Sequence, residues 1–348
     1  MVNPENNILF ALFTSFIITY FAIPKIIFYA KKFKYVDVAG ERASHKGSTP
    51  IFGGIAIFSG IIFSLLFWSK NLENSQFIIA SLVIVFFVGI IDDLLGLTPS
   101  RKLLGQIIAI MIFIYLGEIQ IDNMHGVLGV YKLPDIVATL FTIFVVVVIT
   151  NGVNLIDGVD GLACGVGIIS SFCFGVVAAI MNQLDMAIIA FSLMGSLLAF
   201  LKYNFHPAQI FMGDTGSLVV GMILSVLAIN CIKYGLVTET NGLPNKGPLL
   251  AIVFLSIPLF DSLRVFVVRA LKGDGPLTAG RDHIHHALLD LGYGHKYTSL
   301  ILYAISILLI LGSYFLLEYN INTGIAVLAG VSFFLLLIPF YMLRDKTK

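Results

Sequence analysis

The sequence predicts an all-α protein, a polytopic membrane helix bundle with about eleven transmembrane helices. Residues of the set AVILMFWYC make up 58% of the 348 positions and charged residues only 12%, whereas soluble domains carry about 25% charged residues. The mean hydropathy is +0.97. A spanning helix needs about 20 mostly apolar residues. Eleven stretches approach that length, namely residues 7–30, 51–69, 76–91, 103–118, 135–150, 161–181, 185–201, 217–235, 248–271, 298–317 and 322–343.

The first stretch follows M-V-N-P-E-N-N, which lacks the basic region and cleavage site of a signal peptide, so we expect a retained first span. Placing the loop 31–50 in the cytoplasm puts 17 of the 21 Lys and Arg residues on that side. By the positive-inside rule, this predicts an outside N-terminus, a cytoplasmic C-terminus and an odd number of spans. The other side keeps Lys70, Lys132, Lys233 and Lys246.

No repeat or low-complexity segment divides the chain, so we expect one membrane domain over residues 1–348. With this orientation, five polar loops face the cytoplasm. Ionisable groups beside lipid are costly and are kept mainly for ion, substrate or proton chemistry. The convergence of these loops therefore predicts a polar site at the cytoplasmic leaflet. The loops are residues 31–50, 92–102, 151–160, 202–216 and 272–297.

The first two loops carry basic and acidic pairs. His45 and Lys46 stand beside a glycine-rich entry to the second span, where ordinary surface charge is the other interpretation. Asp92 and Asp93 end the third span and are followed by Arg101-Lys102. Paired carboxylates suit a cation, or one charged and one base role. The basic pair suits a phosphate, and a helix cap is the alternative for the acids.

The third loop reads N-G-V-N-L-I-D-G-V-D-G-L and places Asn151, Asn154, Asp157 and Asp160 three residues apart. Because glycines interrupt this run, we expect a broken or loop-like backbone rather than a continuous helix. Such a segment can aim several amides and acids at one point. A polar turn with helix caps is the alternative.

The fourth loop contains Asn204 and ends in F-M-G-D-T-G-S, with Phe211 and Asp214. An Asp between glycines at the start of a span suits a divalent metal that carries phosphate, or a helix N-cap. Asn204 and Phe211 are suited to hydrogen-bond and stack on a base, although a lone Phe more often packs in a core.

The fifth loop reads R-D-H-I-H-H and gathers Arg281, His283, His285 and His286. Zinc ligation is one interpretation, but H-E-x-x-H spacing and an assisting cysteine are both missing from it. Arg and His donors also clamp a diphosphate, and this is the interpretation we favour.

These motifs together resemble the polyprenyl-phosphate N-acetylhexosamine-1-phosphate transferases. The resemblance runs from about Asp37 to His286 and follows the family order of motifs. It implies transfer of a sugar-1-phosphate from a UDP-sugar to a polyprenyl phosphate, with magnesium and release of UMP; manganese is the alternative metal. H-I-H-H, the eleven spans and Gly96, where the pentapeptide translocase has a lysine, resemble the GlcNAc-1-phosphate branch.

The resemblance also implies roles for single residues. Asp214 corresponds to the principal magnesium ligand and Asn154 to a second one. Asp92 and Asp93 correspond to the catalytic pair and Lys102 to a phosphate-binding lysine. The remaining implied contacts are Asp157, Asp160, Asn204 and Phe211 with the nucleotide, Arg281, His283, His285 and His286 with the diphosphate, and His45 and Lys46 with the acceptor phosphate.

The expected function is transfer of GlcNAc-1-phosphate from UDP-GlcNAc to undecaprenyl phosphate at the bacterial inner membrane, initiating a cell-envelope glycan. Attack is direct with Asp92 as base, which we favour, or passes through an aspartyl-phosphate. Phospho-MurNAc-pentapeptide translocase is the alternative within the family. A secondary transporter would place its polar groups near the midplane. We expect lipid and both substrates as partners, with no nucleic acid, and the sequence is compatible with a homodimer.

Overall fold

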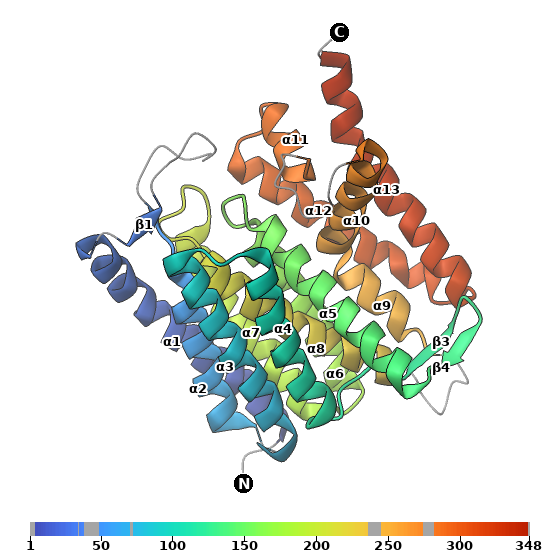
Figure 1. Ribbon diagram of the computed structural model, residues 1–348, viewed down its shortest axis with the longest axis horizontal. Helices are drawn as coiled ribbons and strands as arrows, with labels where there is room; N and C mark the ends of the chain where they lie inside the picture. Colours follow the sequence, from blue (N-terminus) through green and yellow to red (C-terminus); the bar gives the residue numbers. More distant parts are fainter. Residues whose placement is uncertain are drawn as a thin grey trace.

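The computed structural model describes residues 4–33, 35–37, 49–69, 72–235, 245–273 and 282–346, and these are nearly all helical (Figure 1). Two short antiparallel pairs, β1 with β2 and β3 with β4, are the strands of the described chain. In chain order the elements are α1 Pro4–Lys32, β1 Val36–Asp37, β2 Thr49–Pro50, α2 Gly53–Trp68, α3 Leu72–Leu95, α4 Pro99–Tyr115, β3 Asn123–Val127, β4 Val130–Lys132, α5 Asp135–Ile156, α6 Leu162–Ile180, α7 Leu184–Asn204, α8 Gly213–Tyr234, α9 Gly247–Phe254, α10 Ser256–Lys272, α11 Ile284–Asp290, α12 His295–Leu316 and α13 Ile321–Lys346.

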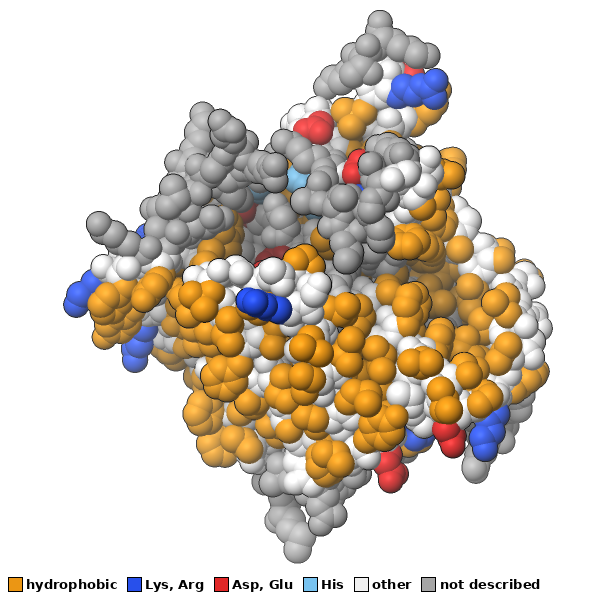
Figure 2. Space-filling model, viewed as in Figure 1, with side chains coloured by type: hydrophobic (Ala, Val, Ile, Leu, Met, Phe, Trp, Pro, Cys, Tyr) orange, Lys and Arg blue, Asp and Glu red, His pale blue; other side chains and the backbone are white. Residues whose placement is uncertain are grey.

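Eight helices of the described chain are long and apolar enough to cross a membrane, and nine if the bent pair α9–α10 counts as one span. The predicted spans 51–69 and 103–118 fall on α2 and α4, which have 16 and 17 residues. Figure 2 shows a broad area of apolar side chains across the middle of the face in view. The chain is therefore a multi-pass membrane protein.

Helix α8 lies in the centre of the bundle. In its most apolar 18-residue window 89% of the residues are buried, against 22% for α1 and α13. It packs against α3, α5 and α2, and also against α6, α7 and α9. A helix that is apolar on every side belongs in such a core, whereas α1 and α13 leave rows of aromatic and aliphatic side chains exposed to lipid.

The predicted single span 248–271 is wrong as a continuous helix, because α9 and α10 meet at Leu255 with a bend of 79°. Pro258 has no N–H to donate to the Phe254 carbonyl, and a proline there opposes a straight helix. Ser170 of α6 donates its hydroxyl to that carbonyl at 2.6 Å. The bend is thus stabilised by a neighbouring helix, as broken helices in membranes require.

The expected break in residues 151–156 is also wrong, because α5 continues to Ile156 and the chain turns only at residues 157–161. Gly152 lies inside the helix, where a Cβ would be 3.0 Å from the Pro258 carbonyl oxygen of α10. Its lack of a side chain therefore serves close helix packing. Gly161 has a φ of 77° and starts α6, so the turn itself does depend on a glycine.

Helices α2, α3 and α8 approach one another almost backbone to backbone. A Cβ on Gly89 of α3 would be 2.4 Å from Thr215 Cα, and one on Gly54 of α2 would be 2.2 Å from the Gly216 nitrogen. Gly89 allows the polar end of α3, and Gly54 allows the start of α2, to reach the first turn of α8. The packing brings together motifs about 120 residues apart.

Candidate active site

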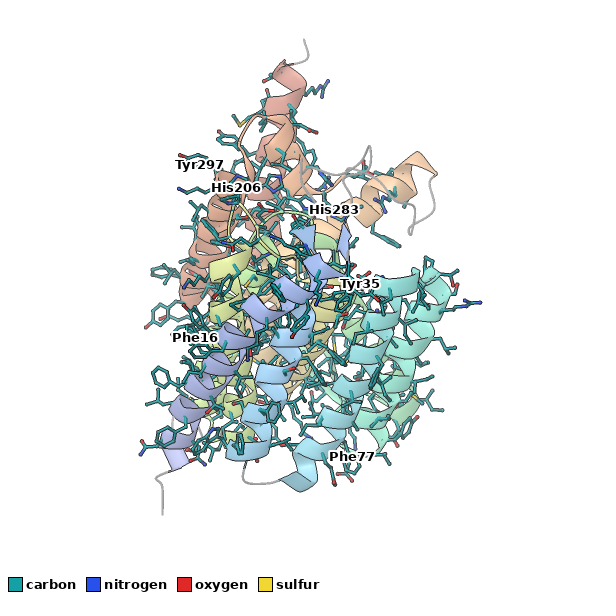
Figure 3. All side chains as sticks on the ribbon, turned by 90° about the vertical axis from the view of Figure 1, so that its left-hand side faces the viewer. Phe16, Tyr35, Phe77, His206, His283 and Tyr297 are labelled. Atoms are coloured by element: carbon teal, nitrogen blue, oxygen red, sulfur yellow. The ribbon has the colours of Figure 1, made fainter. Side chains whose placement is uncertain are left out.

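The polar ends of α3, α4, α5 and α8 meet at one end of the bundle. The N-terminus lies at the opposite end and the C-terminus on this side (Figure 1). In the space-filling view this end is hollowed, and acidic and histidine side chains show in the hollow (Figure 2). His206 and His283 lie at this end, whereas Phe77 lies at the other (Figure 3).

Lys102, in the first turn of α4, links two of the predicted acids. Its Nζ forms ion pairs with the carboxylate of Asp92 and with Asp214 Oδ2, the second at 3.1 Å. Asp92 Oδ1 also accepts the Leu97 N–H at 2.6 Å. The chain can turn there because Gly96 adopts a φ of 68°. Asp92 therefore fixes both the turn after α3 and the lysine.

Asp93 has different partners from its neighbour. Its Oδ1 accepts the backbone N–H of Asp214 at 2.8 Å. Its Oδ2 accepts the backbone N–H of Thr215 at 3.0 Å and the Thr215 hydroxyl at 2.5 Å. Asp93 thus caps the N-terminus of α8 from another helix, which places a negative charge where the helix dipole favours it. Its carboxylate orients Asp214.

Asp214 and Asp157 complete an acidic cluster. Asn154 of α5 donates its amide to Asp214 Oδ1 and, at 2.8 Å, to the Ser217 hydroxyl. Burial, together with the carboxylates of Asp214 and Asp93, raises the pKa of Asp157 well above its usual range. In the described chain Lys102 is the cation paired with this cluster of four carboxylates. Excess negative charge from oxygen ligands suits a hard divalent cation.

The histidine cluster is held by an acid that the sequence analysis did not single out. Asp261 of α10 is fully buried. Its Oδ2 lies 2.8 Å from His283 Nδ1, and its Oδ1 accepts the Ile284 N–H at 3.0 Å. An Asp inside an apolar stretch was the available signal. Asp261 orients His283 and the start of α11.

His285 lies over the turn that contains Asp157. Its ring stacks on His283 with centroids 5.6 Å apart. A Cβ on Gly158 would lie 3.1 Å from His285 Nε2. Burial, chiefly, and the neighbouring His286 lower the pKa of His285 to about 3, so its imidazole is neutral at physiological pH. A neutral ring here offers a hydrogen bond rather than a positive charge.

Two of the residues predicted to contact the nucleotide, Asn204 and Asp160, form hydrogen bonds to other residues of the protein instead. The Asn204 amide accepts the Gly161 N–H at 3.0 Å and donates to the Ile210 carbonyl at 2.9 Å. Asp160 Oδ2 lies 2.6 Å from His206 Nδ1 and accepts the Ala208 N–H at 3.2 Å. Both side chains are buried and hold the segment between α7 and α8 in place.

The other predicted contacts divide into described and undescribed residues. Phe211 is half-buried, and its backbone N–H donates to the Pro50 carbonyl at 2.7 Å, which joins the segment 205–212 to β2. Asp157 is also half-buried. These two side chains therefore remain accessible at the hollow end. His45, Lys46 and Arg281 lie outside the described residues.

An apolar cavity of about 250 Å³ lies among α5, α8 and the α9–α10 bend. Every side chain that lines it is apolar, including Phe144, Val148, Ala228, Ile252 and Leu259. A cavity of this chemistry accepts hydrocarbon and excludes charged groups.

Comparison with known proteins shows similarity over most of the chain. Residues 75–232 match the family described as glycosyl transferase family 4. A decaprenyl-phosphate N-acetylglucosaminephosphotransferase of Mycolicibacterium smegmatis is 32% identical over 83% of this chain and 77% of its own length. A probable undecaprenyl-phosphate N-acetylglucosaminyl 1-phosphate transferase of Bacillus subtilis is 32% identical, over 79% and 75%. A phospho-N-acetylmuramoyl-pentapeptide-transferase of Halalkalibacterium halodurans is 31% identical, over 81% and 89%.

Proposed function

Because the chain belongs to glycosyl transferase family 4, the polyprenyl-phosphate N-acetylhexosamine-1-phosphate transferases, we propose that it transfers GlcNAc-1-phosphate from UDP-GlcNAc to undecaprenyl phosphate and releases UMP. The product starts a cell-envelope glycan. The observation that carries the proposal is the acidic cluster around Asp214, with Lys102 bridging Asp214 and Asp92 at one end of a membrane bundle. A site that must hold two phosphorylated substrates needs such a balance of metal ligands and cations.

Magnesium, with manganese as the alternative, fits the acidic cluster because carboxylate and amide oxygens are the donors present there. Asp214 would be its principal ligand and Asn154 the second. When bound, the ion supplies neutralisation of the charge that develops on the diphosphate. Asp93 keeps Asp214 in place by capping the same helix turn.

Asp92 and Lys102 act on the acceptor phosphate. Lys102 binds the phosphate as a point charge, and Asp92 orients it or accepts its proton. Direct in-line attack of the phosphate oxygen on the sugar-linked phosphorus then releases UMP. His45 and Lys46 assist at the same phosphate.

The donor occupies the neighbouring part of the hollow. His283, His285, His286 and Arg281 contact the diphosphate, with His283 oriented by Asp261. Asp157 and Phe211 contact the nucleoside, and Phe211 stacks on uracil. Asp160 and Asn204 position the segment before α8, because their polar atoms already bind within the protein.

The membrane placement follows the distribution of basic residues. We place the hollow end in the cytoplasm and the N-terminus outside, in the bacterial inner membrane, with the chain 1–348 as one domain. The predicted spans α2 and α4 are included as crossings, which gives eleven. The acceptor phosphate reaches the site from the side, and the apolar cavity beside the α9–α10 bend provides room for part of its prenyl chain.

The test is UMP release by the purified full-length protein with undecaprenyl phosphate and magnesium. UDP-GlcNAc and UDP-MurNAc-pentapeptide are compared at equal concentration. We expect preference for UDP-GlcNAc, because H-I-H-H and Gly96 favour that branch. Preference for the pentapeptide donor overturns the branch assignment and keeps the reaction. No UMP from either donor, with uptake of solute into liposomes, would instead support the transporter.

A further inference from the structure

We propose that Asp160, His206 and His295 form a second metal site, for a transition-metal ion such as Zn²⁺. One carboxylate oxygen and one nitrogen from each imidazole all lie within 4.8 Å of one another. The three residues come from three separate segments: the turn after α5, the segment between α7 and α8, and the first residue of α12. None of them belongs to the acidic cluster that we assign to magnesium.

The donor atoms already face one another. His206 Nδ1 is 2.6 Å from Asp160 Oδ2, and His295 Nδ1 is 3.4 Å from Asp160 Oδ1. The backbone N–H of Asp160 donates to His295 Nδ1 at 3.3 Å. This nitrogen is therefore the unprotonated one of the ring, and a bound ion would replace the Asp160 N–H at its lone pair. The two rings stack with centroids 5.4 Å apart and an interplanar angle of 16°.

Surrounding contacts hold the carboxylate in position. The Ser299 hydroxyl donates to the Asp160 carbonyl at 2.8 Å, and the Ala208 N–H donates to its carboxylate at 3.2 Å. Such outer contacts orient metal ligands and raise affinity. The Asp160 side chain is 1% exposed and that of His206 is 43% exposed, so an ion can enter past His206.

The donor set distinguishes this site from a magnesium site. Two imidazole nitrogens with one carboxylate suit Zn²⁺ and its transition-metal neighbours, whereas Mg²⁺ prefers oxygen ligands. A bound ion would tie the segment 205–212 to the turn 157–161 and to α12. That segment runs directly into Asp214. A bound ion would therefore restrict the motion of the backbone that leads into the first turn of α8.

The test measures Zn²⁺ binding to the purified full-length protein by calorimetry in excess Mg²⁺. We expect one equivalent to bind wild type, and binding at least tenfold weaker in His206→Gln. His206 is the exposed ligand, so this variant should fold, which its melting temperature without zinc verifies. Zn²⁺ should raise the melting temperature of wild type and leave that of His206→Gln unchanged. His125→Gln, altered in the β3–β4 hairpin at the other end, is the matched control and should bind like wild type.

Asp214→Ala separates this site from the acidic cluster. It should retain the zinc equivalent, whatever happens to transfer activity. Loss of zinc binding in Asp214→Ala with retention in His206→Gln would assign the ion to the acidic cluster and overturn the proposal. Absence of zinc binding by wild type, or equal affinity in His206→Gln, would show that the three residues only hold the segment by hydrogen bonds.

Discussion

Asp92 and Asp93 are neighbours in sequence, but their carboxylates have different partners. Asp92 meets Lys102 and the turn after α3, whereas Asp93 is committed to the first turn of α8. The pair therefore need not work as one catalytic unit. We therefore propose that Asp92 is the carboxylate of the pair that acts on a substrate, whereas Asp93 holds the first turn of α8 in place.

Isosteric amides test this division. Asp92→Asn should lower turnover by about 100-fold, the usual contribution of a group that acts on the reacting atoms, and should leave the melting temperature close to wild type. Asp93→Asn turns an amide N–H₂ toward backbone donors, so it should also destabilise the fold by about 1–2 kcal/mol. UMP release and thermal unfolding of each variant give the comparison. Equal unfolding shifts, or turnover unaffected by Asp92→Asn, would contradict it.

The raised pKa of Asp157 predicts that metal binding depends on pH. Burial and the nearby carboxylates of Asp214 and Asp93 raise its pKa. Below the raised pKa its side chain is protonated and neutral, so it adds no charge to the cluster. Because protons and metal compete for carboxylates, the apparent Mg²⁺ affinity should fall as pH decreases through that raised pKa and recover as pH increases.

The measurement is the Mg²⁺ concentration for half-maximal UMP release across a pH series. Asp157→Asn is permanently neutral and should flatten the dependence, with weaker Mg²⁺ affinity at high pH. Asp185→Asn, on α7 at the other end, is the matched control and should keep the wild-type profile. An unchanged profile in Asp157→Asn would remove Asp157 from the metal response.

At the scale of elements, apolar run lengths locate the helices well, because each run reflects a local requirement for spanning lipid. Every predicted stretch falls on a helix or, for 248–271, on a bent pair. The length of an apolar run does not reveal which other helix makes a bend, or a glycine inside a helix, possible. At the α9–α10 bend the Ser170 hydroxyl of α6 donates to the Phe254 carbonyl, and Gly152 of α5 lies against the Pro258 carbonyl of α10.

The same limit applies to the site. Motif order gathers Asp92, Asp93, Asn154 and Asp214 at one end of the chain's fold, since each lies where a span begins or ends. It does not distinguish an acid that caps a distant helix from one that faces substrate. Nor does it identify Asp261, whose role appears only in the folded chain, where its carboxylate meets His283 and the first residue of α11.

The bend itself supplies a prediction. Ser170→Ala should leave the Phe254 carbonyl without its donor in an apolar surrounding, which costs about 1–3 kcal/mol. We expect a lower melting temperature with the acidic cluster intact, since Ser170 is remote from Asp214. Ser171→Ala, whose hydroxyl bonds only within α6, is the control and should unfold like wild type. Equal stability of both variants would show that the bend does not need this donor.

At the scale of the molecule, α8 is the most buried of the spanning helices, and its first turn carries Asp214 of the acidic cluster. α8 is surrounded by α2, α3, α5, α6, α7 and α9, so Asp214 rests on the most constrained backbone of the bundle. Groups that bind and orient charge work best when their support does not move. The more exposed helices α1 and α13 face lipid instead. The site is open to substrates at one end of the bundle.

The orientation of that open end is the last prediction. Leu128, in the β3–β4 hairpin, is 86% exposed, and Asp345, near the end of α13, is also exposed. The two lie at opposite ends of the bundle (Figure 1). In a background with Cys164, Cys173 and Cys231 replaced by Ala, an impermeant maleimide should label Leu128→Cys in intact cells. Asp345→Cys should react only after permeabilisation, because the excess of Lys and Arg on its side keeps that side in the cytoplasm. The reverse pattern would place the acidic cluster outside, away from cytoplasmic UDP-sugars, and would contradict the proposed donor as well as the topology.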